Sequence, residues 1–195
     1  MSGLAIGSGF DDVLAAAQTG APWALQRLYE DLAPVVTGYL RLRGAPEPDD
    51  TASEAFLSVF KGLGGFTGDE GAFRSWVFTI VHRRLLDDRR RRGRRPVTEP
   101  LGDEAIDAVA AVGGDVETDA LQGLSSAWVV EVLGLLSVEQ REVLLLRIVG
   151  DLAVDEVAAV LGKRPGAVRA LQHRGLERLR RELPNRRVAA PDREA

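Results

Sequence analysis

The side chains best suited to a specific chemistry lie near the C-terminal end of the sequence, in a stretch that predicts a helix from Pro165 to Leu183. The helical spacing turns the apolar residues of this stretch to one side. The polar residues left on the other side and at its entrance are Lys163, Arg164, Arg169, Gln172, His173 and Arg174. Arginine and glutamine form paired hydrogen bonds with base edges, and lysine and arginine suit phosphates. The chemistry indicated is therefore binding of a nucleic acid.

A shorter helix is predicted just before this one, at about Val154 to Leu161. The tight turn Gly162-Lys163-Arg164 joins the two, and Pro165 is a favoured first residue of a helix. A short helix, a glycine turn and a second helix form a helix-turn-helix, whose second helix enters the major groove of DNA. A helical hairpin with a solvated basic face is the alternative interpretation of the same residues.

A second concentration of arginine runs from Arg83 to Arg95, where eight arginines stand against two aspartates. It continues a predicted helix that begins near Phe73 and places apolar residues at the three-and-four spacing of one face. The glycine-rich loop before it sets aromatic residues beside cations, which is the combination that unstacked bases need. The residues concerned are Phe66, Phe73, Arg74, Trp76, Arg83 and Arg84. A solvated arginine face, with the aromatic residues in the core, remains the alternative.

The elements that must position these residues are all predicted to be helices. In the first half we expect helices over residues 10–17, 22–42, 51–63 and 73–92, with a kink or break at Pro34. In the second half Trp128 begins a helix, and Ser137 is a natural N-cap for the next, with Gln140 completing a capping box. No strand pattern competes, so the fold class is all-α, with two small helical domains.

The boundaries follow from shifts in composition. From Pro96 to Ser126 all charged residues are acidic, and the stretch has little periodicity. We therefore expect an N-terminal tail over 1–9, a first domain over 10–96, an acidic linker over 97–126, a second domain over 127–184 and a C-terminal tail over 185–195. The net charge of −4 conceals this segregation of basic and acidic segments.

Several classes of function are disfavoured by what the sequence lacks. There is no cysteine, hence no disulfide framework or thiolate metal site. Its two histidines, His82 and His173, lie in different predicted domains, and no phosphate-binding glycine motif is present. We expect no enzyme, no catalytic residue, no metal and no cofactor. With no signal peptide pattern and no apolar run near ~20 residues, we expect a cytoplasmic protein without membrane insertion.

Taken in order, these segments resemble the bacterial sigma factors of RNA polymerase, specifically the small extracytoplasmic-function group of the sigma-70 family. The resemblance of the first domain rests on DDTASEAFLSVFKGL, GGFTGDEGAFRSW and WVFTIVHRRLLDDRRRR. That of the second rests on LLSVEQREVLLLRIVGDLAVDEVAAVLGKRPGAVRALQHRGLERLR. Together they cover nearly all of residues 10–184, in the order and spacing of the family.

The resemblance implies a function for each surface. The outward residues of the third helix would bind the clamp helices of core RNA polymerase, and these are Asp50, Ser53, Glu54, Leu57 and Lys61. Residues for recognition and melting of the minus-ten element would be Phe66, Thr67, Arg74, Trp76, Arg83 and Arg84. Those for the minus-thirty-five element would be Lys163, Arg164, Arg169, Gln172, His173 and Arg174. The polymerase flap and an anti-sigma factor would be further partners.

This sequence departs from the family pattern at Arg83, where asparagine is usual, and in the recognition helix GAVRALQHRGL, where threonine, serine and another arginine are common. Base preference therefore does not transfer from relatives. The main alternative function is a self-standing helix-turn-helix DNA-binding transcription regulator, and a more distant one is an RNA-binding or nucleic-acid-processing protein that uses the arginine-rich helix. A regulator has no need for a docking helix followed by an aromatic and arginine-rich strand-binding surface.

Overall fold

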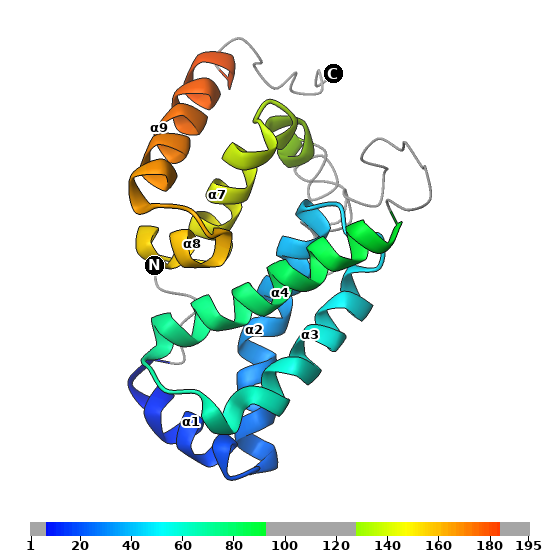
Figure 1. Ribbon diagram of the computed structural model, residues 1–195, viewed down its shortest axis with the longest axis vertical. Helices are drawn as coiled ribbons and strands as arrows, with labels where there is room; N and C mark the ends of the chain where they lie inside the picture. Colours follow the sequence, from blue (N-terminus) through cyan, green and yellow to red (C-terminus); the bar gives the residue numbers. More distant parts are fainter. Residues whose placement is uncertain (1–6, 93–127, 184–195) are drawn as a thin grey trace, which may run out of the picture.

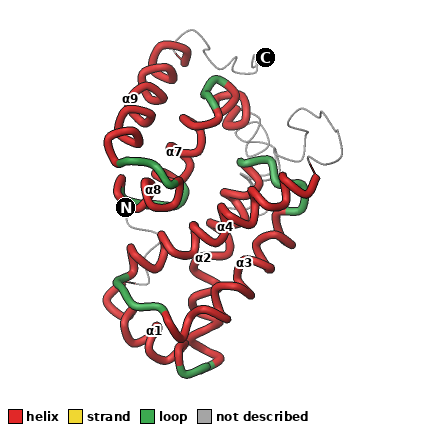
Figure 2. Tube along the Cα trace, viewed as in Figure 1, coloured by secondary structure: helices red, strands yellow, loops and turns green. Residues whose placement is uncertain are grey.

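The computed structural model describes residues 7–92 and 128–183, and these are helices joined by short loops (Figures 1 and 2). No strand occurs within these two ranges, so the all-α prediction is confirmed for them. The predicted acidic linker, the C-terminal tail and most of the N-terminal tail lie outside the described residues.

The first range forms a four-helix unit with two short 3-10 turns, Gly7–Gly9 and Leu63–Gly65. Its helices are α1 (Phe10–Gln18), α2 (Pro22–Leu42), α3 (Pro48–Gly62) and α4 (Glu70–Arg92). Two of them begin earlier than predicted. Pro48 occupies the first turn of α3, where its missing N–H costs no hydrogen bond. Asp69 precedes α4, and its Oδ1 accepts a hydrogen bond from the Ala72 N–H at 2.8 Å.

Of the kink or break predicted at Pro34, the break is wrong, because α2 continues through it from Pro22 to Leu42. Proline removes one backbone N–H from a helix, but neighbouring packing can hold the helix together. Here the residues on either side of Pro34 are anchored in the core: Leu32 is 2% exposed and Val36 is fully buried. Tertiary packing therefore outweighs the local preference of proline.

The second range begins with a helix over residues 128–134, followed by α7 (Val138–Ile148), α8 (Val154–Leu161) and α9 (Pro165–Glu182). The capping box is confirmed: the Gln140 N–H donates to Ser137 Oγ and the Ser137 N–H donates to Gln140 Oε1. Gly162 ends α8 with φ of 62°, a left-handed conformation that glycine adopts without strain. The turn that follows leads to α9, so the helix-turn-helix geometry is present.

The two helical units share a continuous hydrophobic core, which the sequence did not predict. Helix α4 contacts α3 on one side and α8 on another, and α2 contacts α7 (Figure 1). Buried residues from Phe10 in α1 to Leu171 in α9 belong to a single cluster. Helix α4 is therefore the element to which both units attach.

Candidate nucleic-acid interface

The loop before α4 carries a cluster of aromatic side chains. Phe66 stacks on Trp76 with ring centroids 5.1 Å apart, and it meets Phe73 edge to face at 5.3 Å. Phe73 also contacts Phe10 of α1 at 5.6 Å. Because Phe73 is 1% exposed it belongs to the core, whereas Phe66 and Trp76 are half-buried. Phe73 is thus a core residue, whereas the side chains of Phe66 and Trp76 remain partly exposed to solvent.

Helix α1 holds this loop in place through Gln18. The side-chain amide of Gln18 donates hydrogen bonds to the carbonyl oxygens of Leu63 at 3.1 Å and Phe66 at 2.7 Å. These bonds satisfy carbonyls where the helical hydrogen-bond pattern ends. The aromatic pair Phe66 and Trp76 is therefore presented on a positioned loop, next to exposed Thr67.

The arginines predicted to share this surface do not all face solvent. Arg83 is exposed, and Arg84 is partly exposed with Glu54 of α3 at 3.4 Å. Arg74 is only 5% exposed and lies 3.6 Å from Glu70, and its Nη1 has no hydrogen-bond partner among the described residues. In this arrangement of the chain Arg74 is not available to a ligand, and its role as a contact stays a prediction.

The residues predicted to bind polymerase form one exposed stripe on α3. Their spacing of three and four residues places them along a single side of the helix, and all five are exposed: Asp50, Ser53, Glu54, Leu57 and Lys61. Leu57 has 59% of its surface exposed, which is high for a large apolar side chain. The opposite side of α3, with Ala55 and Phe56, packs into the core.

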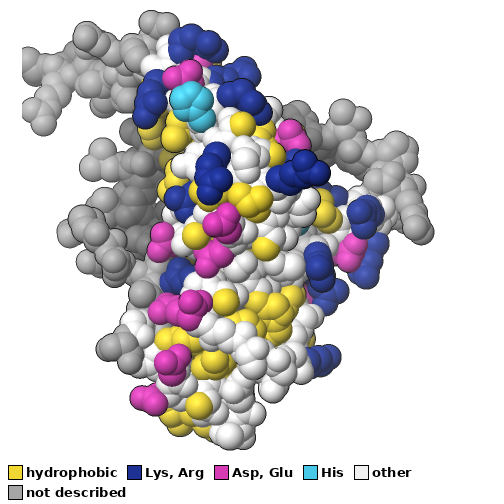
Figure 3. All heavy atoms as spheres, turned by 60° about the vertical axis from the view of Figure 1, so that its left-hand side comes forward, with side chains coloured by type: hydrophobic (Ala, Val, Ile, Leu, Met, Phe, Trp, Pro, Cys, Tyr) yellow, Lys and Arg dark blue, Asp and Glu magenta, His cyan; other side chains and the backbone are white. Residues whose placement is uncertain are grey.

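Helix α9 presents the predicted reading surface. Val168, Leu171 and Gly175 are buried against the rest of the second unit, as the spacing predicts. The opposite side exposes Arg164, Arg169, His173 and Arg174, with Gln172 partly exposed. Figure 3 shows one face of the molecule, with most Lys and Arg side chains on its left-hand and upper part gathered towards the top and most Asp and Glu side chains below them. Five of the six predicted residues therefore share an accessible basic surface.

Lys163, the sixth, is engaged within the unit. Its ammonium group donates to the Glu139 carboxylate of α7 at 2.5 Å. This hydrogen bond and the positive charge of Lys163 lower the pKa of Glu139. Lys163 remains partly exposed, but its first role in this structure is to tie the turn before α9 to the start of α7.

A buried group of polar side chains lies where α2, α4 and α7 meet. The Arg43 guanidinium donates to the Glu142 carboxylate, and the Arg89 guanidinium donates to the Arg43 carbonyl oxygen. The Tyr39 hydroxyl lies 3.3 Å from His82 Nδ1. Burial raises the pKa of Tyr39 to about 12 and lowers the pKa of His82. Sequence reasoning missed this group, because Arg43 and Glu142 are far apart in the chain and neither belongs to a motif.

The lowered pKa of buried His82 predicts how the stability of the folded chain depends on pH. Burial is the main cause of its lowered pKa; Glu142 opposes that effect, and Arg43 and Arg89 add to it. Because the unfolded chain takes up a proton near pH 6.5 and the folded chain does so only at lower pH, this contribution to stability is complete above pH ~6.5 and is lost as pH falls through the folded pKa. One such group changes the free energy of unfolding by at most about 1.4 kcal/mol per pH unit.

Urea unfolding at pH 7.5 and pH 5.5 measures this effect. The parent chain should lose more stability between the two values than His82→Gln, in which the titrating group is replaced by an uncharged amide. All other side chains are the same in both proteins, so the difference between them isolates His82. Equal losses in parent and variant would contradict the assignment of a neutral, buried imidazole.

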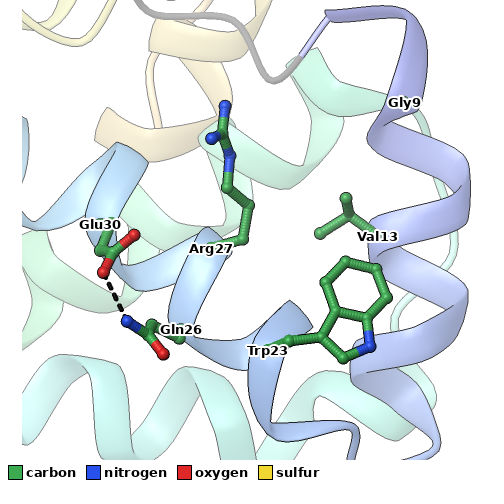
Figure 4. A pocket seen from close by; sticks show the side chains of 6 residues that line it. All are labelled: Gly9, Val13, Trp23, Gln26, Arg27 and Glu30. Atoms are coloured by element: carbon green, nitrogen blue, oxygen red, sulfur yellow. Dashed lines mark hydrogen bonds between the residues drawn. The ribbon is translucent and has the colours of Figure 1, made fainter.

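A shallow pocket of about 400 Å³ lies between α1 and the first turns of α2. Figure 4 shows Trp23 beside Val13, with Arg27, Gln26 and Glu30 along α2. Trp23 is 58% exposed, so the pocket is open to solvent. None of the predicted binding residues lines it. The structure also contains, within its described ranges, no helix long and apolar enough to cross a membrane.

Comparison with known proteins matches both units. The profile of Sigma-70 region 2 matches residues 28–95, and that of Sigma-70 region 4 matches residues 126–179. The chain is 32% identical over 192 residues to the ECF RNA polymerase sigma factor SigD of Mycobacterium tuberculosis, covering 95% of this chain and 87% of that protein. It is 34% identical over 171 residues to the ECF RNA polymerase sigma factor BldN of Streptomyces coelicolor, covering 87% of this chain and 64% of that protein.

Among solved structures, the fold is similar to that of CnrH in its complex with the cytosolic domain of CnrY. The TM-score is 0.64 with 24% sequence identity, and the match covers 92% of this chain and 100% of CnrH. At this level of identity the comparison concerns the fold alone. It extends over both helical units.

Proposed function

The chain belongs to the extracytoplasmic-function group of the sigma-70 family of RNA polymerase sigma factors, and we propose from this how its surfaces divide the work of promoter recognition. A sigma factor of this family directs core RNA polymerase to promoters and has no catalytic activity of its own. The proposal below therefore concerns which residues bind polymerase and which bind each promoter element.

We assign polymerase docking to the exposed stripe of α3, that is Asp50, Ser53, Glu54, Leu57 and Lys61. The supporting observation is Leu57, an apolar side chain that is 59% exposed among polar neighbours. Such a residue fits an interface in which a central apolar anchor is surrounded by polar contacts. The clamp helices of core polymerase are the surface we propose for it, and the polymerase flap is the partner we propose for the second unit.

The minus-ten element is assigned to the loop and α4. Phe66 and Trp76 offer a stacked aromatic surface for unpaired bases. Thr67 follows Phe66 in the loop, and Arg83 and Arg84 follow Trp76 about two turns along α4, where they can make polar and phosphate contacts. Arg74 joins this set only when its burial is relieved. Aromatic stacking is what distinguishes a surface for a separated strand from one for duplex DNA.

The minus-thirty-five element is assigned to α9, with Arg169, Gln172, His173 and Arg174 at base edges and Lys163 and Arg164 at phosphates. The accessible basic side of the helix supports this assignment. A location in the cytoplasm and control by an anti-sigma factor complete the proposed function. CnrH, whose fold is similar, is itself found in a complex with the cytosolic domain of CnrY.

Run-off transcription with purified core polymerase on a promoter library tests the function. Initiation at specific sites should require both the chain and the polymerase. If the chain shifts duplex DNA on its own and never yields specific initiation, the self-standing helix-turn-helix regulator becomes the better description.

Arg169→Ala should weaken binding of the upstream promoter element by ~1–3 kcal/mol and reduce discrimination between base pairs, provided that the guanidinium makes a paired contact with a base. Binding to duplex DNA with a selected upstream element, measured at matched salt concentration, reports both effects. Arg178→Ala is the matched control, since it removes the same charge from an exposed position of α9 outside the proposed set. Equal discrimination in parent and Arg169→Ala would remove Arg169 from the base-reading residues.

A further inference from the structure

Two close approaches define the side of α4 that faces the second unit, one near its first turn and one near its middle. A Cβ at Gly71 would lie 2.6 Å from Glu156 Oε1 of α8, and a Cβ at Gly150, in the α7–α8 loop, would lie 3.3 Å from the Phe78 ring. Ser75 and His82, each 7% exposed, continue the same side at helical spacing. Arg74 lies one turn after Gly71, next to Ser75. The second unit therefore covers the side of α4 next to the proposed strand-binding residues.

In this arrangement the chain cannot bind the minus-ten and minus-thirty-five elements of one promoter at the same time. Elements centred 10 and 35 positions before the start site are separated by 25 base pairs, or ~85 Å of duplex at about 34 Å per 10 base pairs. Helix α4 has 23 residues and α9 has 18, so they are about 34 Å and about 27 Å long. Because α4 contacts α8 directly and a three-residue turn joins α8 to α9, the two reading surfaces lie much closer together than the elements.

The covalent chain permits a larger separation. Residues 93–127 connect the two units, and at about 3.3–3.6 Å per residue a segment of this length can reach on the order of 100 Å. An open form that reaches both elements is thus compatible with chain length. The arrangement seen here, which we call the closed form, must give way to it before both surfaces act on one promoter.

Opening must break the Arg43–Glu142 ion pair between α2 and α7, together with the hydrophobic contacts between the two units. The two side chains are 2% and 13% exposed, so each charge has lost most of its hydration and interacts with the opposite charge instead. Arg89 and Arg141 lie in the same group, where burial and then the charge of Arg43 lower the pKa of each. Glu142 is therefore the acid that faces a concentration of positive charge in which Arg43 is the buried member.

An ion pair of this kind suits a reversible contact. The gain from pairing is largely offset by the hydration that both charges lose, so the pair adds little net stability while both members are present. Removing one member leaves the other buried without compensation, which is strongly unfavourable. The closed form also leaves Arg74 Nη1 without a hydrogen bond, a cost that exposure to water or phosphate would relieve.

We propose that the free chain exchanges between this closed form and an open form, that the Arg43–Glu142 pair holds α7 and α8 against the first unit, and that promoter DNA competes with α8 for the side of α4 that carries Arg74. The open form and the competitor are named from the proposed function; the closed form and the place of the ion pair in it stand on the structure alone.

Distance measurement between two spin labels tests the closed form directly. Because the chain has no cysteine, Asp12→Cys in α1 and Arg178→Cys in α9 provide two exposed labelling sites without further changes. Double electron–electron resonance on the full chain should give a narrow distribution of distances. Glu142→Arg should shift it to longer and broader distances, and Glu139→Arg should not, because Glu139 pairs with Lys163 inside the second unit. A broad distribution in the parent, or an unchanged one in Glu142→Arg, would overturn the proposal.

The effect on function is measured as the concentration of chain that gives half-maximal run-off transcription. If roughly nine molecules in ten are closed, opening should lower that concentration ~10-fold in Glu142→Arg relative to the parent chain. A variant that opens but needs the parental concentration would show that closure does not compete with promoter binding. The spin-label result needs neither polymerase nor promoter, so failure of the closed form and failure of the proposed function give different outcomes.

Discussion

Replacing Leu57 with glutamate is expected to weaken binding to core RNA polymerase ~100-fold and to reduce promoter-specific transcription with it. Leu57 is 59% exposed in the middle of the α3 stripe, where it makes the anchor we assign to the interface. Loss of a central apolar anchor costs at least about 2 kcal/mol, and a buried carboxylate without a partner adds to that cost. A total near 3 kcal/mol corresponds to ~100-fold weaker binding.

Titration of labelled chain with core polymerase measures this loss. The matched control is Trp23→Glu, which places the same charge at another large apolar residue of nearly equal exposure, 58%, in the first turn of α2 (Figure 4). Since both side chains are exposed, both variants should fold. Equal weakening by the two substitutions would point to a general effect of charge and would remove the docking role from α3.

Phe78→Ala is expected to lower the free energy of unfolding by about 3–5 kcal/mol, the range for loss of a buried aromatic side chain. Phe78 is fully buried, and its ring meets that of Tyr39 edge to face at 5.4 Å. Gly150 approaches it so closely that a Cβ there would be 3.3 Å from the ring. Alanine would leave a cavity bordered by α2 and the α7–α8 loop, which no single helix can fill by moving.

Urea unfolding followed by circular dichroism gives the size of this effect. Phe60→Ala removes the same group from α3, where the side chain is only partly buried, and should cost clearly less. A similar loss in both variants would mean that Phe78 contributes no more than an ordinary partly exposed phenylalanine. The position of Phe78 between the two units would then make no additional contribution to the free energy of unfolding.

The sequence predicted best where local signals and tertiary packing agree. The Ser137 and Gln140 capping box, the Gly162 turn and the buried side of α9 follow from residue type and helical spacing, and all three occur as predicted. Pro34 shows the opposite case. A local rule predicted a kink or break there, but buried neighbours on both sides keep α2 continuous.

For the candidate site, the sequence identified residue types but not their accessibility. The α3 stripe and the basic side of α9 are exposed as periodicity predicts, because each lies on one helix. The burial of Arg74 and the pairing of Arg43 with Glu142 depend on how two units meet, and the residues concerned are separated by an entire linker. Helical periodicity carries no information about contacts at that separation.

The hydrogen bonds from Gln18 bear on how short a working fragment of the first unit can be. Matching to the region 2 profile begins at residue 28, yet α1 supplies the donor for the Leu63 and Phe66 carbonyls and the Phe10 ring that packs on Phe73. A protein truncated to the matched segment would expose Phe73 and release the loop that presents Phe66. Crystallisation or binding studies of the isolated unit should therefore retain α1, whose contribution a profile boundary does not reveal.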